Sequence, residues 1–423
     1  MELMIVKNII LNQKPGMLVL EDGKILSFEH VGYKVDSGAK IFDGRGCHLL
    51  PGLIDAHVHL REPGFEYKEN IKTGLQAAAS GGFSRVMAMG NTRPVNDNSS
   101  VTGLMLRRNM ESHPDGPYVH PVGALTINLE GQHLSPLAEL KEAGCKAFSN
   151  DGLPVRNNEI FRRAMEYASD LDMLVIDHCE DACLAGEGVM NEGHVSGYLG
   201  LKGIPSTAES LHVARDILLA AYLNIPVHLA HISCVESLEL IEWAKAKSIP
   251  VTAETCPHYL FWDDEMVQGY NTMAKVNPPL RSRKDVTAMR HAVKNGVIDI
   301  IATDHAPHAD FEKEVPFAHA PNGISGLDTA LGLCLELVRD NILDLQDIVK
   351  LMSASPGRLF NLPFNTFQKG DQADFILVDM EYEWQVTPET ILSKGKNTPC
   401  LGRTLQGRVM ANFINGREIL NRF

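Results

Sequence analysis

The chain has no apolar run that approaches the roughly 20 residues needed to span a membrane. Its start, Met1-Glu2-Leu3-Met4-Ile5-Val6-Lys7, lacks the basic region and the long apolar core of a secretion signal. The eight cysteines are scattered without CxxC spacing, and most lie in apolar runs. Such cysteines are typical of buried thiols in a reducing compartment. These absences predict a cytoplasmic protein with no membrane partner.

Basic residues are in deficit, since 39 Lys and Arg face 53 Asp and Glu and the formal net charge is −14. Nucleic acid is therefore excluded as the main partner, because no basic field exists to neutralise phosphates. A small anionic substrate is still compatible with this net charge, since its binding depends only on the charges around its own site. The 423 residues are enough for one large α/β barrel with an appendage, or for two to three smaller domains.

Short strand patterns occupy both ends of the chain. They cover residues 3–6, 17–20 and 24–28 near the start and 373–379 and 407–414 near the end, where Asn415-Gly416 is a typical hairpin turn. Neither end holds enough strands for a core of its own. We therefore predict one small composite β domain built from residues 1–50 and 361–423, with a catalytic domain over residues 51–360.

Between these ends, strand-like runs alternate with helix-like stretches such as residues 208–223 and 236–247, which is typical of a parallel α/β fold. Eight units predict a (β/α)8 TIM barrel, whose active site lies at the C-terminal ends of its strands. The eight runs are residues 49–59, 84–91, 118–124, 145–150, 173–178, 226–231, 250–255 and 297–304.

Metal-binding residue types recur where these runs end. His57 and His59 close the first run, and alternate side chains of a strand point to one face, so the two imidazoles form half of a metal site. A lone histidine after an apolar run is usually structural. Here, however, four histidines and two aspartates end strands of one predicted barrel, and together they predict a metal centre: His57, His59, Asp151, His178, His231 and Asp304.

This set resembles the amidohydrolase superfamily, and within it class I dihydroorotase. The resemblance implies a zinc-activated hydrolytic site with two Zn²⁺ ions per chain. It also implies the reversible conversion of N-carbamoyl-L-aspartate to L-dihydroorotate in de novo pyrimidine synthesis, and it leaves open a homodimer and an association with aspartate transcarbamoylase. The matching stretches are His57-Val58-His59-Leu60-Arg61-Glu62-Pro63-Gly64, Asn91-Thr92-Arg93-Pro94, His178-Cys179-Glu180-Asp181, Asn277-Pro278-Pro279-Leu280-Arg281, Asp304-His305-Ala306-Pro307-His308 and Ala320-Pro321-Asn322-Gly323-Ile324.

The resemblance places two metals between the pair His57/His59 and the pair His178/His231, with Asp304 as a metal ligand that also transfers the proton. Two residues compete for the bridging position. Many members of the superfamily use a carboxylated lysine, and Lys146 matches that position. Class I dihydroorotases use an aspartate where Asp151 stands. A bare ammonium inside a barrel is costly, so Lys146 points outward, finds a partner or is carbamylated, and we favour Asp151.

The resemblance also implies the substrate contacts. Arg61 offers a planar fork for the carboxylate of dihydroorotate. Its companions are Asn91 and His308, and the ring amides are read by Asn277 and by the backbone of Asn322 and Gly323. Residues 309–321 are expected to form a loop at the mouth, which can act as a lid.

Two other functions compete with this interpretation. One is a different cyclic amidohydrolase, namely hydantoinase, dihydropyrimidinase or allantoinase, which Arg61 and the Asp151 bridge argue against. The other is an inactive dihydroorotase-like subunit that scaffolds aspartate transcarbamoylase. Such a subunit has no need of all six metal positions, and all six are present.

Overall fold

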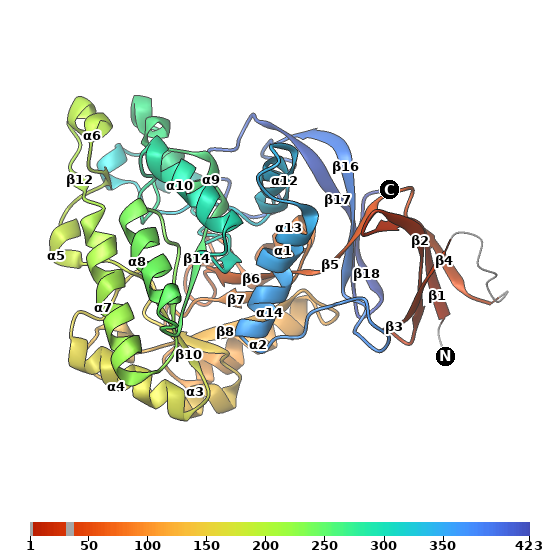
Figure 1. Cartoon of the computed structure of the whole chain (residues 1–423), viewed down its shortest axis with the longest axis horizontal. Helices are drawn as coiled ribbons and strands as arrows, with labels where there is room; N and C mark the ends of the chain where they lie inside the picture. Colours follow the sequence, from red (N-terminus) through yellow and green to blue (C-terminus); the bar gives the residue numbers. More distant parts are fainter. Residues whose placement is uncertain (1–2, 31–37) are drawn as a thin grey trace.

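The computed structural model of the chain describes residues 3–30 and 38–423. A helix-covered barrel forms one end of the molecule and a separate β-sheet forms the other, and the first and last described residues lie at the sheet (Figure 1). Within the described residues no helix is both long enough and apolar enough to cross a membrane.

The barrel sheet contains eight strands in the order β15-β14-β13-β10-β9-β8-β7-β6, and every pair is parallel. A parallel bridge between Val58 and His305 joins β6 to the segment that follows β15, and the His59 amide donates to the His305 carbonyl at 2.8 Å. The predicted (β/α)8 fold class is thereby confirmed. The strands are β6 Leu53–Val58, β7 Phe83–Ala88, β8 Tyr118–Ala124, β9 Ala147–Ser149, β10 Leu174–Asp177, β13 Val227–Leu229, β14 Val251–Thr255 and β15 Ile300–Ile301.

Helices surround this barrel, and some of them begin and end at recognisable caps. The helix α1 starts after Asn70, whose side chain accepts the Thr73 amide at 2.9 Å, and stops at Gly82, where φ is +91°. The longer helices are α1 Ile71–Gly81, α2 Ser99–Ser112, α3 Leu137–Ala143, α4 Asn158–Asp170, α7 Thr207–Leu223, α8 Val235–Ala246, α10 Arg283–Lys294 and α12 Ala330–Arg339.

Shorter elements complete the connections. The short helices are α5 Ala182–Ala185, α6 His194–Leu199, α9 Pro257–Phe261, α11 Asp310–Lys313, α13 Leu345–Val349 and α14 Ser355–Leu359. The 3₁₀ and π turns are η1 Ile127–Leu129, η2 Asp264–Tyr270, η3 Thr272–Ala274, η4 Phe317–His319 and η5 Lys350–Ala354, and the strands β11 Met190–Asn191 and β12 Gly203–Ile204 pair with each other. Among these elements, α11, η3 and η4 lie in the segments that shape the candidate site.

The barrel strands are apolar on both faces, as expected for a parallel sheet covered by helices. One face of each strand joins the large core beneath the helices, for example Val175 and Ile301. The other face joins a smaller cluster that includes Ile176 and Ile300 and is closed by Phe360. The predicted metal-binding side chains lie beyond this packing, at the C-terminal ends of the strands.

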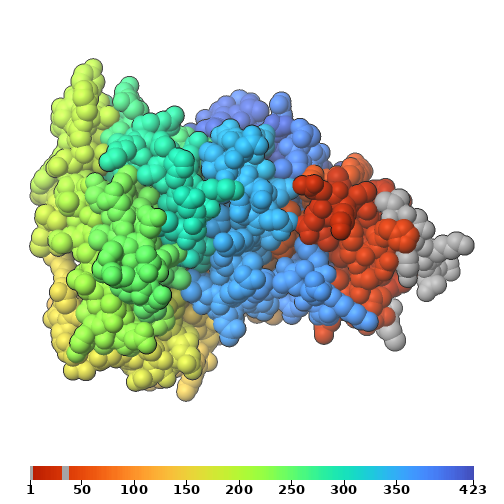
Figure 2. Space-filling model, viewed as in Figure 1, coloured from red at the N-terminus to blue at the C-terminus, as the bar shows by residue number. Residues whose placement is uncertain are grey.

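The terminal sheet has the order β18-β17-β16-β5-β1-β2-β3, with β4 paired to β1, so it draws strands from both ends of the chain. Its core packs N-terminal residues such as Leu18 against C-terminal residues such as Phe413, and the C-terminal segment lies between the barrel and the N-terminal strands (Figure 2). The strands are β1 Leu3–Leu11, β2 Lys14–Glu21, β3 Lys24–His30, β4 Lys40–Asp43, β5 His48–Pro51, β16 Phe375–Gln385, β17 Thr404–Ile414 and β18 Arg417–Asn421.

The predicted run over residues 49–59 is wrong as a single strand. Leu50 in β5 pairs with Ile376 of the terminal sheet, whereas β6 begins at Leu53 and pairs with β7. Gly52 lies at the transition: its amide donates to the Asp374 carbonyl at 2.9 Å, and a Cβ there would lie 2.8 Å from the Ser84 hydroxyl oxygen. The chain therefore changes sheets at a position that has no room for a side chain.

The Asn415-Gly416 turn is confirmed. Both residues have positive φ, +50° and +73°, and they join Ile414 to its partner Arg417 in the β17–β18 hairpin. The division into domains at residues 1–50, 51–360 and 361–423 stays a prediction.

Candidate metal centre

The six predicted metal ligands meet at the C-terminal end of the barrel. His57 lies in β6, and the other five follow the ends of β6, β9, β10, β13 and β15 within three residues. Each of the six residues is no more than 6% exposed. The barrel topology therefore brings together side chains that are up to 247 positions apart, as the sequence predicted from their places at strand ends.

Asp151 lies at the middle of this group. Its Oδ1 is 3.3 Å from His57 Nε2, 3.4 Å from His231 Nε2 and 3.5 Å from His178 Nδ1. Its Oδ2 is 3.4 Å from His59 Nε2. One carboxylate thus faces all four imidazoles.

Several of these atoms are buried without a hydrogen-bond partner in the part of the chain that the structure describes. They are His57 Nε2, Asp151 Oδ1, His178 Nδ1 and both ring nitrogens of His231. Buried polar atoms are almost always satisfied, so a group of orphaned atoms around one point indicates a missing ligand. Imidazole nitrogen and carboxylate oxygen are ligands of zinc and related divalent metals.

Two overlapping triads have their ligand atoms within 4.8 Å of one another, namely His57/His59/Asp151 and Asp151/His178/His231. Asp151 belongs to both triads, as a bridging ligand must. The residues present therefore fit divalent metal, with Asp151 shared between two positions.

The charges of the centre also favour a cation. Burial by itself lowers the pKa of His57, but Asp151 and Glu254 outweigh it and raise that pKa well above its ordinary value. Burial by itself raises the pKa of Asp151, but His57, His178 and His231 hold it well below its ordinary value. The negative charge of the carboxylates, which favours protonated imidazole, also attracts a metal ion to the space between Asp151 and the histidines.

Asp304 faces the same centre from the last strand. Its Oδ1 lies 3.1 Å from His59 Nε2 and 3.6 Å from His57 Nε2. Burial opposes ionisation, but the hydrogen bond with His59 and the charge of His57 lower the pKa of Asp304 below its ordinary value. Asp304 is therefore an ionised carboxylate at neutral pH, able to ligate a metal or to accept a proton.

Lys146 does not join the cluster. It precedes β9, its amide donates to the Pro121 carbonyl at 2.9 Å, and its side chain lines a separate cavity of about 730 Å³ with Asp172 and Phe360. Asp151 follows the other end of β9, and five residues of strand span roughly 16 Å. The two candidates for the bridge thus lie toward opposite ends of the barrel.

A cavity of about 160 Å³ opens over the metal centre. Five of the six predicted substrate contacts line it, namely Arg61, Asn91, Asn277, Asn322 and Gly323. The rest of its lining is His59, Asp151, Gly152, His178, His231, Val276, Asp304 and Ala306. The sixth predicted contact, His308, lies beside Arg61, with its Nε2 3.4 Å from Arg61 Nη2 and 2.8 Å from the Asn322 carbonyl oxygen.

The two asparagines have different surroundings. Asn91 accepts a hydrogen bond from His59 Nδ1 at 2.9 Å and donates to Asp151 Oδ2 at 3.3 Å, so it orients two ligand residues as well as lining the cavity. Asn277 donates to Glu180 at 2.9 Å, and its amide oxygen is buried without a partner among the described residues. That oxygen is free to accept a hydrogen bond from a ligand.

Three site residues have left-handed backbone. The φ angles are +35° at His231, +45° at Asp304 and +60° at Arg61. Such conformations cost roughly 1–3 kcal/mol each in residues other than glycine, and they cluster at functional sites where the surroundings impose them.

Glu254 is a member of the centre that the sequence reasoning missed. His57 Nδ1 donates to its Oε1 at 2.7 Å, and His228 Nε2 lies 3.2 Å from its Oε2. Both residues that contact Glu254 are fully buried, as is Glu254 itself. A carboxylate on the outer nitrogen of a metal-binding histidine fixes its tautomer and turns the other nitrogen to the metal. The available signal was an acidic residue inside the apolar strand 250–255.

Replacing Glu254 with glutamine is expected to weaken metal binding by roughly 10–100-fold while the fold is kept. Glutamine preserves size but removes the charge that holds the Nδ1 proton of His57. Chelator competition on the purified protein measures this affinity. The matched control is Glu336→Gln, since Glu336 lies on α12, away from the centre, and pairs with Arg403. Equal affinity in the wild type and Glu254→Gln would refute the assigned role.

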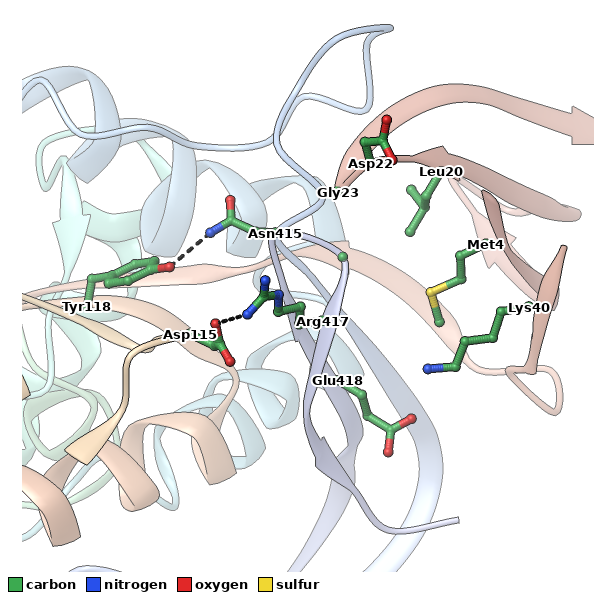
Figure 3. A pocket seen from close by; sticks show the side chains of 11 residues that line it. Met4, Leu20, Asp22, Gly23, Lys40, Asp115, Tyr118, Asn415, Arg417 and Glu418 are labelled. Atoms are coloured by element: carbon green, nitrogen blue, oxygen red, sulfur yellow. Dashed lines mark hydrogen bonds and ion pairs between the residues drawn. The ribbon is translucent and has the colours of Figure 1, made fainter. Parts of the chain in front are cut away.

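Larger hollows lie elsewhere but lack this chemistry. The one in Figure 3, about 680 Å³, lies where the terminal sheet meets the barrel. Its walls are tied by the Asn415 amide, which donates to the Tyr118 hydroxyl at 2.9 Å, and by the pair Arg417–Asp115. No triad of metal-binding side chains lines it in the described chain.

Known proteins resemble the chain along its whole length. The family model described as Dihydro-orotase-like matches residues 46–237. The dihydroorotase of Syntrophus aciditrophicus (strain SB) is 48% identical over 95% of this chain and 94% of its own length. The dihydroorotase of Pelobacter propionicus (strain DSM 2379 / NBRC 103807 / OttBd1) is 46% identical over 96% and 95%, respectively.

Solved structures share the fold. The L-hydantoinase (dihydropyrimidinase) from Arthrobacter aurescens superimposes with a TM-score of 0.88 at 21% identity, covering 100% of this chain and 97% of its own. The dihydropyrimidinase from Brevibacillus agri NCHU1002 gives a TM-score of 0.85 at 22% identity, covering 99% and 95%. At such identities the likeness establishes the architecture alone. With relatives at 46–48% identity over nearly its full length, the chain belongs to the dihydroorotase family of cyclic amidohydrolases.

Proposed function

We propose that the chain is a class I dihydroorotase that interconverts N-carbamoyl-L-aspartate and L-dihydroorotate in de novo pyrimidine synthesis. One observation carries the proposal: Arg61 and an Asp151-centred histidine cluster line the same small cavity. The cluster suits the hydrolysis of an amide, and the guanidinium suits a substrate that bears a carboxylate. A cytoplasmic location, a homodimer and an association with aspartate transcarbamoylase stay predictions.

We assign two Zn²⁺ ions to the centre. His57 and His59 would hold one, His178 and His231 the other, Asp151 both, and Asp304 would complete the first set. Bound divalent metal lowers the pKa of water, which makes water a better nucleophile, and polarises the carbonyl oxygen of the ring amide, which makes the carbonyl carbon a better electrophile. The support for this assignment is the orphaned atoms around Asp151 and the two triads that share it.

In the hydrolytic direction, the oxygen of water bonds to the ring carbonyl carbon, and the bond from that carbon to the ring nitrogen breaks. Asp304 takes the proton of the attacking water on its carboxylate and delivers it to the leaving nitrogen. Cyclisation runs the same transfers in reverse. Asp304 suits this work because it is ionised and lines the cavity beside His59.

Recognition of the substrate follows from the rest of the lining. Arg61 is held by a hydrogen bond from its Nε to the Pro307 carbonyl at 3.2 Å, and its Nη2 lies 3.4 Å from His308 Nε2. Its remaining N–H groups are available for a carboxylate. The unpartnered amide oxygen of Asn277 would accept from a ring N–H, and the backbone of Asn322 and Gly323 would contact the ring amides. Hydantoin and dihydrouracil lack the carboxylate that Arg61 is placed to bind.

The deciding experiment compares dihydroorotate, hydantoin, dihydrouracil and allantoin as substrates of the wild type and of Arg61→Met, alongside metal analysis of both proteins. The wild type is expected to prefer dihydroorotate. Arg61→Met keeps bulk and deletes the fork, so kcat/KM for dihydroorotate should fall by on the order of 10²-fold, because a buried carboxylate loses its partner.

Activity on an uncharged ring should fall far less in Arg61→Met, and Arg61→Lys should restore only part of the loss, since it keeps charge without the bidentate geometry. Equal losses on charged and neutral rings would show that Arg61 is structural. A wild type that prefers hydantoin, dihydrouracil or allantoin would refute the proposed substrate.

A further inference from the structure

The side chain of Lys313 ends in a cage of backbone carbonyls. The residue is 2% exposed, and its Nζ donates to the carbonyl oxygens of Pro321 at 2.8 Å, Gly323 at 3.0 Å, Thr272 at 3.2 Å and Lys275 at 3.3 Å. Within the described chain no carboxylate forms an ion pair with it. A buried ammonium is costly unless oxygens replace its water shell, and here main-chain oxygens do so.

Lys275 makes the reciprocal contact. It is 5% exposed, and its Nζ donates to the carbonyls of Phe317 at 2.8 Å and Ala318 at 2.9 Å in η4. The Gly323 amide donates to the Lys275 carbonyl at 2.9 Å, and the Thr272 hydroxyl donates to the Lys313 carbonyl at 2.7 Å. Each of the segments 272–277 and 310–323 therefore sends a lysine into the backbone of the other.

These two segments carry one wall of the cavity over the metal centre. The first ends at Asn277, and the second ends at Asn322 and Gly323. The wall is packed tightly, since a Cβ at Gly323 would lie 2.5 Å from the Ala306 carbonyl oxygen. The Gly323 carbonyl that Lys313 binds also accepts from the Asn397 amide at 2.9 Å. A loss of the ammonium would leave the Gly323 carbonyl with the Asn397 bond alone and the Pro321 carbonyl without its Lys313 donor, which loosens the backbone on either side of Asn322.

We propose that Lys313, with Lys275 in support, is a positioning residue that fixes the Asn277 and Asn322–Gly323 wall against the substrate ring. The proposal rests on the proposed function for the identity of that ring. Lys313 itself lines no part of the cavity and acts only through the carbonyls that it binds. Its loss should therefore weaken substrate binding more than the chemical step, because the six candidate metal ligands, Asp304 among them, lie at the ends of barrel strands and outside the segments 272–277 and 310–323.

The cage suggests a direct test by chemical rescue. Lys313→Ala removes three methylenes and the ammonium but keeps the four carbonyl oxygens, so n-propylammonium fits the vacated space. Lys313→Met fills the space with apolar atoms and leaves no room for the amine. Tetramethylammonium has no N–H donor and serves as the ionic-strength control.

The matched control variant is Lys245→Met. Lys245 also donates to a backbone carbonyl, that of Gly296 at 3.1 Å, and pairs with Asp299 at 2.7 Å, but it is on α8 and lines no part of the cavity. Burial lowers the pKa of Lys313 to about 7, so all assays are run below that pH to keep the ammonium charged.

We expect Lys313→Ala to raise KM for dihydroorotate by about tenfold with kcat within about threefold of the wild type. n-Propylammonium should restore KM in Lys313→Ala, and neither tetramethylammonium in that variant nor n-propylammonium in Lys313→Met should do so. Lys245→Met should keep the wild-type KM. The proposal would be overturned if Lys313→Ala left KM unchanged. It would also be overturned if KM rose in Lys313→Ala and neither n-propylammonium nor tetramethylammonium lowered it.

Amide hydrogen exchange gives a readout that is independent of substrate. Exchange over residues 314–323 should be faster in Lys313→Ala and slow again with n-propylammonium. A wild type that does not turn over dihydroorotate would refute the proposed function, but the exchange comparison would still decide the role of Lys313. If Lys313→Ala folds only with n-propylammonium, the cage is supported; if neither amine allows folding, Lys313 is a structural residue and the proposal fails.

Discussion

Replacing Asp151 with alanine is expected to remove nearly all turnover and most of the bound metal, whereas Lys146→Ala should at most weaken activity. Asp151 faces four imidazoles at 3.3–3.5 Å, and its removal takes away the one carboxylate that all four share. We expect kcat/KM to fall by on the order of 10³-fold or more, which corresponds to roughly 4 kcal/mol of transition-state stabilisation. Steady-state kinetics and metal analysis of the purified variants measure both effects.

The comparison separates the two possible bridges because Lys146 lines a cavity at the other end of β9. Lys146→Ala is the matched control for the loss of a side chain next to the same strand. If Lys146→Ala lost the metal and Asp151→Ala kept it, the bridge would be a carboxylated lysine. The assignment to class I would then lose its support from the metal centre.

The barrel was predictable because its strands are short apolar runs with clear boundaries. The expected strands 118–124 and 250–255 differ from β8 Tyr118–Ala124 and β14 Val251–Thr255 by at most one residue. A parallel barrel also gathers the C-terminal ends of all its strands at one face. The position of a histidine or aspartate at the end of a run was therefore enough to predict that these side chains meet.

The division between β5 and β6 could not be predicted from the apolar pattern. Leu49 and Leu53 are both leucines and both buried, so neither residue type nor hydrophobicity tells which sheet each one joins. The transition depends on the Gly52 amide reaching the Asp374 carbonyl, more than 300 residues away in the sequence. Long-range pairing of this kind leaves no local signature beyond a glycine.

The supporting contacts were missed for a similar reason. Glu254 acts on His57 across 197 positions, and only the fold shows that their side chains meet. Lys313 is bound by main-chain oxygens, which every residue carries, so the sequence of its partners holds no information about the contact. Metal-binding side chains can be predicted from residue type in the sequence. Residues that hydrogen-bond to main-chain carbonyls can be identified only from the structure.

Replacing Asp304 with asparagine is expected to keep the metal and to lower kcat by about 10²–10⁴-fold, the range attributed to general acid–base catalysis. Asparagine preserves the size of the side chain and one oxygen that can face the metal centre. It cannot accept the proton of the attacking water, because a neutral amide is a very weak base. The loss should therefore appear in kcat for dihydroorotate hydrolysis, with a much smaller change in KM.

Metal analysis and kcat on the same preparation distinguish the two roles of Asp304. Asp299→Asn is the matched control, since Asp299 bonds the Ala253 amide at 2.8 Å and pairs with Lys245, away from the cavity, and should keep kcat near that of the wild type. Asp304 lies 3.1 Å from His59 Nε2, close enough to share a metal with it. If Asp304 served only to hold that metal, Asp304→Asn would lose metal and activity together. Full metal content with kcat reduced at least about 10²-fold would instead place the proton transfer on the Asp304 carboxylate, because only the basicity of that group has been removed.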